Sequence, residues 1–153
     1  MNLYDVLKKL NIVYEEVCHN KVMTIEEAKK IETMIDGIGS KTLFLTDKKN
    51  YYLVVLEENK RANIKELAIL LGCNKLSFAS SEKLKEVLNL EEGSVTPLGI
   101  INDIDNKVIL LIDKDLKNNK VLFHPNVNTR TMSITYDDLI KFIDHENHKY
   151  ILF

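Results

Sequence analysis

Residues 42–56, TLFLTDKKNYYLVVL, carry the pattern that decides the fold. Two runs rich in β-branched, aromatic and other apolar side chains, 42–46 and 51–56, flank the polar segment DKKN. Two such runs joined by a short turn-forming segment are typical of a β-hairpin. The sequence therefore predicts two adjacent antiparallel strands here, and further elements are predicted on either side of them.

Five helices are predicted around this hairpin from the spacing of apolar residues and from residues that cap helix ends. Thr24-Ile25-Glu26-Glu27 has the form of a capping box, in which the Thr24 hydroxyl accepts from the Glu27 amide. Gly72 stands where a glycine commonly follows the last turn of a helix. The predicted helices span 3–10, 25–34, 64–71, 80 or 81 to 88, and 135 or 136 to 143.

The remaining strands complete one sheet in this prediction. Residues 99–102 and 107–112 are expected to pair across the turn at 103–106. Because some strands adjoin as hairpins and others are separated by helices, an α+β fold with a mixed, mostly antiparallel sheet is favoured over a regular βαβ repeat. No linker is visible, so we expect one domain over 1–153. The other predicted strands are 13–17, 76–79, 121–124 and 131–134, with an apolar tail at 150–153.

Composition excludes several classes of protein. The 153 residues are 45% hydrophobic, which is enough for a real core in one compact domain. The net charge of -2 excludes a strongly basic, nonspecific nucleic-acid binder, although a local basic face stays possible. No apolar run approaches the roughly 20 residues of a membrane span, and the start lacks the apolar stretch of a secretory signal. With only Cys18 and Cys73, we expect reduced thiols in a cytoplasmic protein.

Polar residues with special geometry crowd into four segments. Lys41 follows a predicted loop at 37–40 and begins an apolar strand, so its ammonium group can lie in a cleft while its stem packs on the strand. The alternative is an ordinary solvated lysine. Segment 93–99, GSVTPLG, is a turn whose backbone amides can bind an anion or a carbonyl group. Its alternative is a structural turn between a helix and a strand.

The third segment is 123–129, FHPNVNT, in which His124 precedes a proline and is therefore expected to be extended. The fourth is 19–24, HNKVMT, which can line a cleft or simply form a loop and a helix cap. No metal constellation is predicted, and His145 and His148 are expected at the surface. The residues around Ser94 lack the Gly-x-Ser-x-Gly pattern, which disfavours a serine hydrolase.

Taken together, these segments resemble the YbaK/ProX family of aminoacyl-tRNA editing domains. The GSVTP and FHPN motifs look most like the ProX branch, also called ProXp-ala or PrdX, which hydrolyses alanine mischarged onto proline tRNA. Thr42 differs, because that branch usually has asparagine there. Lys41-Thr42 is more like the YbaK branch, which clears cysteine. The matching motifs are His19 with Val22-x-Thr24 and Glu27-Ala28, then 41–45, 76–80, 93–99 and 123–129.

The resemblance implies a trans-editing hydrolase, an aminoacyl-tRNA deacylase with an editing-domain-like, partly barrel-like sheet and neither metal nor cofactor. Its implied partner is tRNA(Pro) mischarged with alanine, with prolyl-tRNA synthetase as a further candidate, and no membrane is implied. The implied catalytic residues are Lys41, Gly99 and His124. Lys41 would fix the carbonyl or phosphate end of the substrate by its charge. The implied substrate-binding residues are Met23, Thr24, Thr42, Ser94, Thr96, Pro97, Leu98, Asn126 and Thr129.

An aminoacyl ester is already activated, so the implied mechanism needs no protein nucleophile. The enzyme would place a water with help from the ribose 2′-hydroxyl, while the 93–99 loop donates amides and His124 lines the pocket, with a general-base role left open. Met23, Thr42 and Leu98 are the expected pocket walls that exclude proline. Two alternatives stay open, a Cys-tRNA(Pro) deacylase and a noncatalytic tRNA-binding or regulatory module. A local basic patch would come from Lys29, Lys30, Lys48, Lys49, Lys60 and Lys65.

Overall fold

The protein is described by a computed structural model that covers residues 2–21 and 24–153. Its centre is the predicted hairpin, formed by β2 (Ile38–Thr46) and β3 (Tyr51–Glu57). The two strands pair antiparallel from Ser40 opposite Glu57 to Thr46 opposite Tyr51. The connecting turn is closed by the Asp47 carboxylate, which accepts from the amides of Lys49 and Asn50. This part of the sequence prediction is confirmed.

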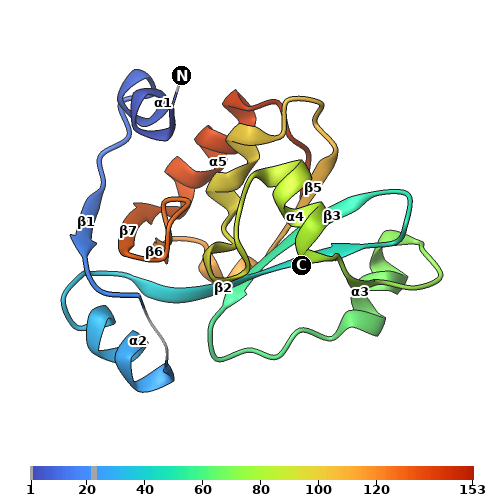
Figure 1. Cartoon of the computed structure of the whole chain (residues 1–153), viewed down its shortest axis with the longest axis horizontal. Helices are drawn as coiled ribbons and strands as arrows, with labels where there is room; N and C mark the ends of the chain where they lie inside the picture. The colour runs from blue at the N-terminus through green and yellow to red at the C-terminus, as the bar shows by residue number, and fades with distance from the viewer. Residues whose placement is uncertain (1, 22–23) are drawn as a thin grey trace.

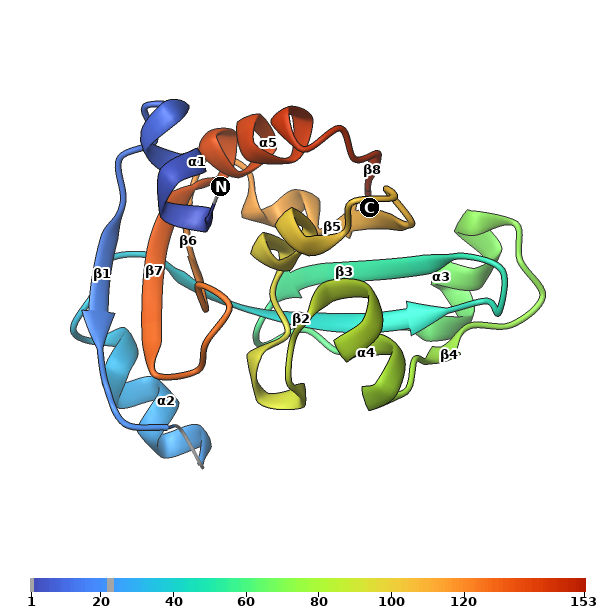
Figure 2. The ribbon, with the colours of Figure 1, turned by 45° about the horizontal axis from the view of Figure 1, so that its top comes forward.

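β2 begins four residues before the predicted strand, so the expected loop at 37–40 is wrong. Ile38 and Gly39 pair in parallel with Val121 and Leu122 of β6 (Lys120–Phe123), and this pairing extends the strand. β2 therefore runs from one half of the sheet into the other, as Figure 2 shows. Lys41 consequently lies inside a strand, where the neighbouring strands fix its position.

The strands form a mixed sheet, as predicted, in the order β1-β7-β6-β2-β3-β5-β8 with β4 beside β2. β6 and β7 pair antiparallel, whereas β5 pairs in parallel with both β3 and β8. Figure 1 shows β1, β6 and β7 together on one side of the molecule and β3 and β5 on the other. The bounds of the outer strands are β1 Glu15–Cys18, β4 Ser77–Phe78, β5 Val108–Ile112, β7 Arg130–Thr135 and β8 Tyr150–Leu152.

The predicted strand at 99–102 is wrong, because these residues belong to a 3-10 helix, η2 (Pro97–Asn102). Pro97 stands in the first turn, and the Thr96 side chain accepts from the Leu98 amide and so caps the helix. The Gly99 amide then donates to the Thr96 carbonyl over 3.2 Å. β5 takes its partners from β3 and β8 and not from a hairpin with this segment.

All five predicted helices are present, each with a side-chain cap at its N-terminus. Thr24 caps α2 by accepting from the Glu27 amide. Gly72 follows α3 with a left-handed backbone, at φ 69°, as expected of a glycine in this position. The helices are α1 Leu3–Lys9, α2 Ile25–Glu32, α3 Ile64–Leu71, α4 Ser81–Leu88 and α5 Tyr136–His145.

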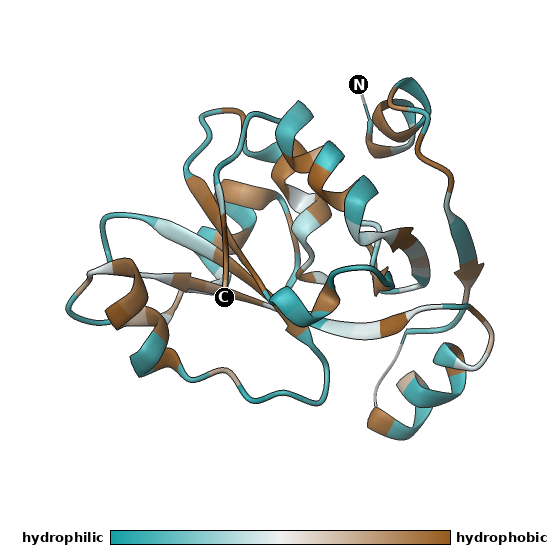
Figure 3. Cartoon of the chain, turned by 180° about the vertical axis from the view of Figure 1, so that it is seen from behind, coloured by the Kyte–Doolittle hydropathy of each residue, from teal (hydrophilic) through white to brown (hydrophobic). Residues whose placement is uncertain are grey.

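Two apolar clusters hold these elements together. The larger lies between the sheet and α1, α4 and α5, and the smaller lies under α3. Figure 3 shows apolar residues concentrated on the central strands, whereas the outward turns of the helices are mainly polar. α2 differs from the other helices because none of its residues is buried. In the part of the chain that the structure describes, no helix has the length and apolar character needed to cross a bilayer.

His148 corrects a further expectation, because it is buried and not at the surface. Its side chain is 1% exposed, and its Nε2 lies 2.9 Å from Oδ2 of Asp103. Its Nδ1 lies 2.8 Å from the Glu146 carbonyl oxygen. The pair joins the turn after α5 to the turn before β5, so His148 has a structural role.

Candidate active site

A cavity of about 290 Å³ opens where the first half of β2, the end of β3, α2, β6 and the 3-10 helix η1 (Glu92–Ser94) meet. These elements are far apart in the sequence, and the parallel pairing of β2 with β6 brings them together. The lining residues are Ala28, Ile31, Glu32, Gly39, Ser40, Lys41, Thr42, Glu58, Glu92, Gly93, Val95, Thr96, Leu122, Phe123, His124 and Thr131.

Lys41 is the lysine of this cavity. It sits on β2 opposite Leu56 of β3, and its side chain is half-buried. No hydrogen bond or ion pair joins its ammonium group to any of residues 2–21 or 24–153. An unpaired cation in a partly enclosed cleft is suited to contact a carbonyl oxygen or an oxyanion.

His124 lies just after β6 and lines the same cavity. Its Nδ1 is 3.0 Å from the carbonyl oxygen of Arg130. Because a carbonyl oxygen only accepts, Nδ1 carries a proton and donates it. In the neutral ring, Nε2 is then an acceptor, and no hydrogen bond joins it to another described residue. The ring also meets His19 edge-on, with 6.5 Å between the ring centroids.

The two predicted loops lie against each other at the rim of the cavity. A Cβ added to Gly93 would lie 3.0 Å from Nδ2 of Asn128, so the absence of a side chain allows this close approach. Thr131 of β7 borders the same region, and its hydroxyl lies 2.8 Å from Nε2 of His19. Segments 93–99 and 123–129 are thus neighbours in space, as expected if both contribute to one substrate site.

The structure brings only some of the predicted site residues together. Lys41, Thr42, Thr96 and His124 line the cavity. Thr24 caps α2, and the carbonyl of Thr129 accepts from the His19 amide. Met23 lies outside the described residues. The predicted residues that do not line the cavity are Thr24, Ser94, Pro97, Leu98, Gly99, Asn126 and Thr129.

Leu98 does not form a cavity wall, which corrects the expectation for this residue. Its side chain is fully buried in the larger apolar cluster. Gly99 is also buried, and a Cβ there would lie 2.6 Å from Cδ1 of Leu90. The 3-10 helix η2 turns these residues towards the core, so only the first part of the 93–99 segment reaches the cavity.

Three carboxyl groups that sequence reasoning missed also line the cavity, those of Glu32, Glu58 and Glu92. Glu32 ends α2 and Glu58 follows β3, and both side chains reach over Gly39. Burial, together with a hydrogen bond to Glu58 and repulsion from it, raises the pKa of Glu32 to about 7. In sequence each glutamate looks like an ordinary solvated residue, and no motif marks either of them.

No group of three His, Cys, Asp or Glu side chains within residues 2–21 and 24–153 is arranged to hold a metal ion. The two cysteines are free, Cys18 exposed and Cys73 partly buried. The chemistry available at the cavity among the described residues therefore rests on an unpaired ammonium group, a histidine, backbone amides and three carboxyl groups.

Solved structures share this fold. A structure described as a candidate trans-editing enzyme for prolyl-tRNA synthetase matches with a TM-score of 0.74. It is 18% identical in sequence, and the match covers 97% of this chain and 92% of the other. At that identity the likeness concerns the fold alone.

Sequence relatives are closer. The prolyl-tRNA editing protein ProX of Acetoanaerobium sticklandii is 39% identical over 140 residues, which are 90% of this chain and 85% of the relative. The prolyl-tRNA synthetase associated domain-containing protein 1 of Danio rerio is 33% identical over 150 residues, which are 95% and 82% of the two chains. The model of the aminoacyl-tRNA editing domain matches residues 19–142. The chain therefore belongs to the aminoacyl-tRNA editing domain family.

Proposed function

We propose that this editing protein hydrolyses the ester that joins alanine to the terminal ribose of tRNA(Pro). The observation that carries the proposal is the unpaired ammonium group of Lys41 in a cavity shared with His124 and η1. The ProX name of the relative from Acetoanaerobium sticklandii supports prolyl-tRNA as the substrate class. The GSVTP and FHPN motifs support alanine as the amino acid removed.

The reaction needs a water molecule, a held carbonyl group and a leaving ribose oxygen. Water adds to the ester carbon, the bond from that carbon to the ribose oxygen breaks, and the ribose oxygen takes up a proton. Lys41 stabilises the negative charge that develops on the carbonyl oxygen. Nε2 of His124 accepts a hydrogen bond from the terminal ribose or from the water, because its Nδ1 proton is committed to Arg130.

Selectivity against proline follows from size. A synthetase pocket that admits proline discriminates against alanine by only about 1–3 kcal/mol, since one or two missing carbons change little else. A second and smaller site solves this problem by excluding the larger side chain. The apolar part of the cavity wall supplies such a site in our proposal, and its members are Ala28, Ile31, Val95, Leu122 and Phe123.

Cysteine is the second candidate amino acid, and Thr42 is the observation that favours it. Thr42 lines the cavity at the position where the alanine-clearing branch usually has asparagine. Its β-branched side chain has restricted rotamers and can narrow the pocket as asparagine does, while it changes the polar contact.

A deacylation panel tests the proposal. Purified protein is offered Ala-, Cys-, Ser- and Pro-tRNA(Pro), and we expect alanine to be released fastest and proline to be spared. Thr42→Asn is expected to keep or sharpen the preference for alanine. If the wild-type protein clears cysteine at least as fast as alanine, the cysteine assignment replaces ours.

A further inference from the structure

Glu32 and Glu58 meet above Gly39 because that residue has no side chain. A Cβ built on Gly39 would overlap Oε1 of Glu32 and Oε2 of Glu58, so the two carboxyl groups occupy the place that a side chain would fill. They come from different elements, the end of α2 and the turn after β3. Both line the cavity that contains Lys41.

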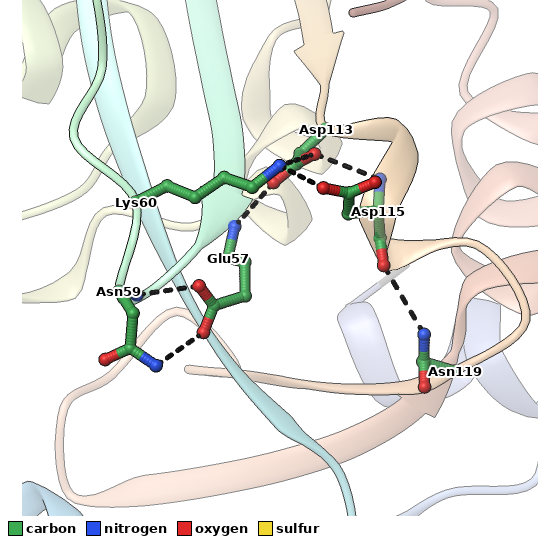
Figure 4. A network of polar contacts seen from close by, with 6 residues as sticks. All are labelled: Glu57, Asn59, Lys60, Asp113, Asp115 and Asn119. Carbon is green, nitrogen blue, oxygen red and sulfur yellow. Dashed lines mark hydrogen bonds and ion pairs between the residues drawn. The ribbon is translucent and has the colours of Figure 1, made fainter.

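The turn that carries Glu58 is firmly held. The Glu58 amide donates to the Gly39 carbonyl over 3.1 Å, and the preceding Glu57 amide donates to Oδ2 of Asp113 over 3.0 Å. Figure 4 shows the Glu57 amide and Nζ of Lys60 both bound to Asp113. The backbone from which the Glu58 side chain extends is therefore fixed beside Gly39.

Lys41 does not neutralise the carboxyl pair, since it forms no ion pair with either glutamate. The cavity consequently holds a cation and a pair of carboxyl groups that form no ion pair with that cation. The ligand that suits it has an electron-rich group beside a positive charge. An aminoacyl ester has this arrangement, because one carbon atom separates its carbonyl group from its α-ammonium group.

We propose that Glu32 and Glu58 together bind the α-ammonium group of the aminoacyl ester and so aim its carbonyl group at Lys41. The inference rests on the proposed function, because it assigns two further positioning residues to the same site. An ammonium group relieves the repulsion between the two carboxylates and supplies three donors to their oxygens. The pair thereby recognises what all amino acids share, and the apolar wall recognises the side chain.

Burial and the neighbouring Glu58 raise the pKa of Glu32 to about 7. Lys29 opposes this rise and Glu57 adds to it. The other charged or titratable groups at the cavity are Lys41, Glu92 and His124. Two carboxyl groups so close together resist full ionisation when no cation lies between them. Binding of an ammonium group therefore releases a proton near neutral pH.

The experiment compares Ala-tRNA(Pro) with N-acetyl-Ala-tRNA(Pro), which lacks the positive charge. Single-turnover deacylation is measured at increasing enzyme concentrations for the wild-type protein, Glu32→Gln, Glu58→Gln and the control Glu26→Gln. Glu26 lies on the exposed part of α2 and away from the cavity. Thermal melting of each variant shows that it is folded.

We expect the wild-type protein to need about 10- to 100-fold more enzyme to reach half-maximal rate on the acetylated substrate, the range for loss of a charged hydrogen bond. Glu32→Gln and Glu58→Gln should each raise the enzyme concentration needed for half-maximal rate on the free-amine substrate. Neither variant should change the concentration needed on the acetylated substrate. Glu26→Gln should change the concentration needed on neither substrate. Equal use of both substrates by the wild-type protein, or equal losses on both in the variants, would overturn the inference.

Failure of the proposed specificity is distinguishable from failure of this inference. If the protein clears Cys-tRNA(Pro) instead, the same comparison is made with N-acetyl-Cys-tRNA(Pro). A preference for the free-amine substrate over the acetylated one that depends on Glu32 and Glu58 would then support ammonium binding by this pair. Alanine would be replaced by cysteine as the amino acid removed. If the cleaved substrate shows no such preference for the free amine, the inferred role of Glu32 and Glu58 is overturned as well.

Discussion

The turn that ends β3 separates two groups of carboxylates with opposite properties. On one side Asp113, whose side chain is 1% exposed, accepts from the Glu57 amide, the Asp115 amide and Nζ of Lys60 (Figure 4). Burial alone would raise the pKa of Asp113, but these three donors hold it below its ordinary value. On the other side Glu32 meets a second carboxyl group, and its pKa is raised.

The two groups of carboxylates differ in whether hydrogen-bond donors surround them. The Asp113 group has donors for both of its oxygens and fastens the turn to the loop after β5. Within residues 2–21 and 24–153, no lysine or arginine forms an ion pair with Glu32 or Glu58, and both side chains face the cavity. Strongly perturbed carboxyl groups in a cleft are typical of sites that await a ligand. The fastened side of the turn also positions the side that faces the cavity.

The largest expected effect is on the deacylation rate, and it distinguishes Lys41 of the cavity from Lys60 of the Asp113 group. Lys41→Ala should lower the single-turnover deacylation rate by about 10²–10³, because one charged contact to the transition state is lost. Its melting temperature should stay near that of the wild-type protein, since Lys41 makes no ion pair with the described residues.

Lys60→Ala is the matched control, because its ammonium group is bound to Asp113 and Asp115. This variant should keep the wild-type rate and lose stability, because the buried Asp113 carboxylate loses one of its three donors. If the Lys41→Ala variant is folded and deacylates at the wild-type rate, Lys41 has no more effect on the reaction than Lys60.

The next effect is on stability. Asp113→Ala leaves the amides of Glu57 and Asp115 without their acceptor, and the free energy of unfolding should fall by about 2–3 kcal/mol. Because the folded-state pKa of Asp113 is lowered, its contribution is present above the ordinary pKa and is lost as pH falls through the folded value. Urea unfolding at neutral and acidic pH measures both effects.

An acid-range loss of stability that is the same in Asp113→Ala and in the wild-type protein would contradict this account. Asp105→Ala is a suitable control, because Asp105 is an exposed aspartate in the turn before β5. It should change neither the free energy of unfolding at neutral pH nor its decline in acid.

The hairpin could be predicted from sequence because its pattern is local. The segment at 99–102 could not, because Thr96 and Pro97 start a 3-10 helix and the strand partners of β5 come from distant residues. Lys41 and His124 were found through motifs that surround them. Glu32 and Glu58 were missed because their meeting depends on the extension of β2 through Gly39, a tertiary event with no local sign.

The smallest expected effect concerns the pH dependence of stability in Glu32→Gln. The pKa of Glu32 is raised from 4.5 to about 7 by burial and by Glu58, so the folded protein holds this proton more tightly than the unfolded chain. Stability should therefore decline as pH rises from 4.5 to about 7. Glu32→Gln carries no such proton and should lack this part of the decline, so its gain over the wild-type protein is greater at pH above 7 than near 4.5.

Urea unfolding of Glu32→Gln, the wild-type protein and Glu26→Gln across this range isolates the contribution. Glu26→Gln makes the same chemical change on the same helix at an exposed position, so its curve should follow that of the wild-type protein. If the free energy of unfolding depends on pH identically in all three proteins, the carboxyl pair carries no shared proton. Glu32 and Asp113 would then differ in their packing and not in their pKa shifts. A flatter slope in Glu32→Gln alone would tie the stability that is lost near neutral pH to the carboxyl groups that line the cavity.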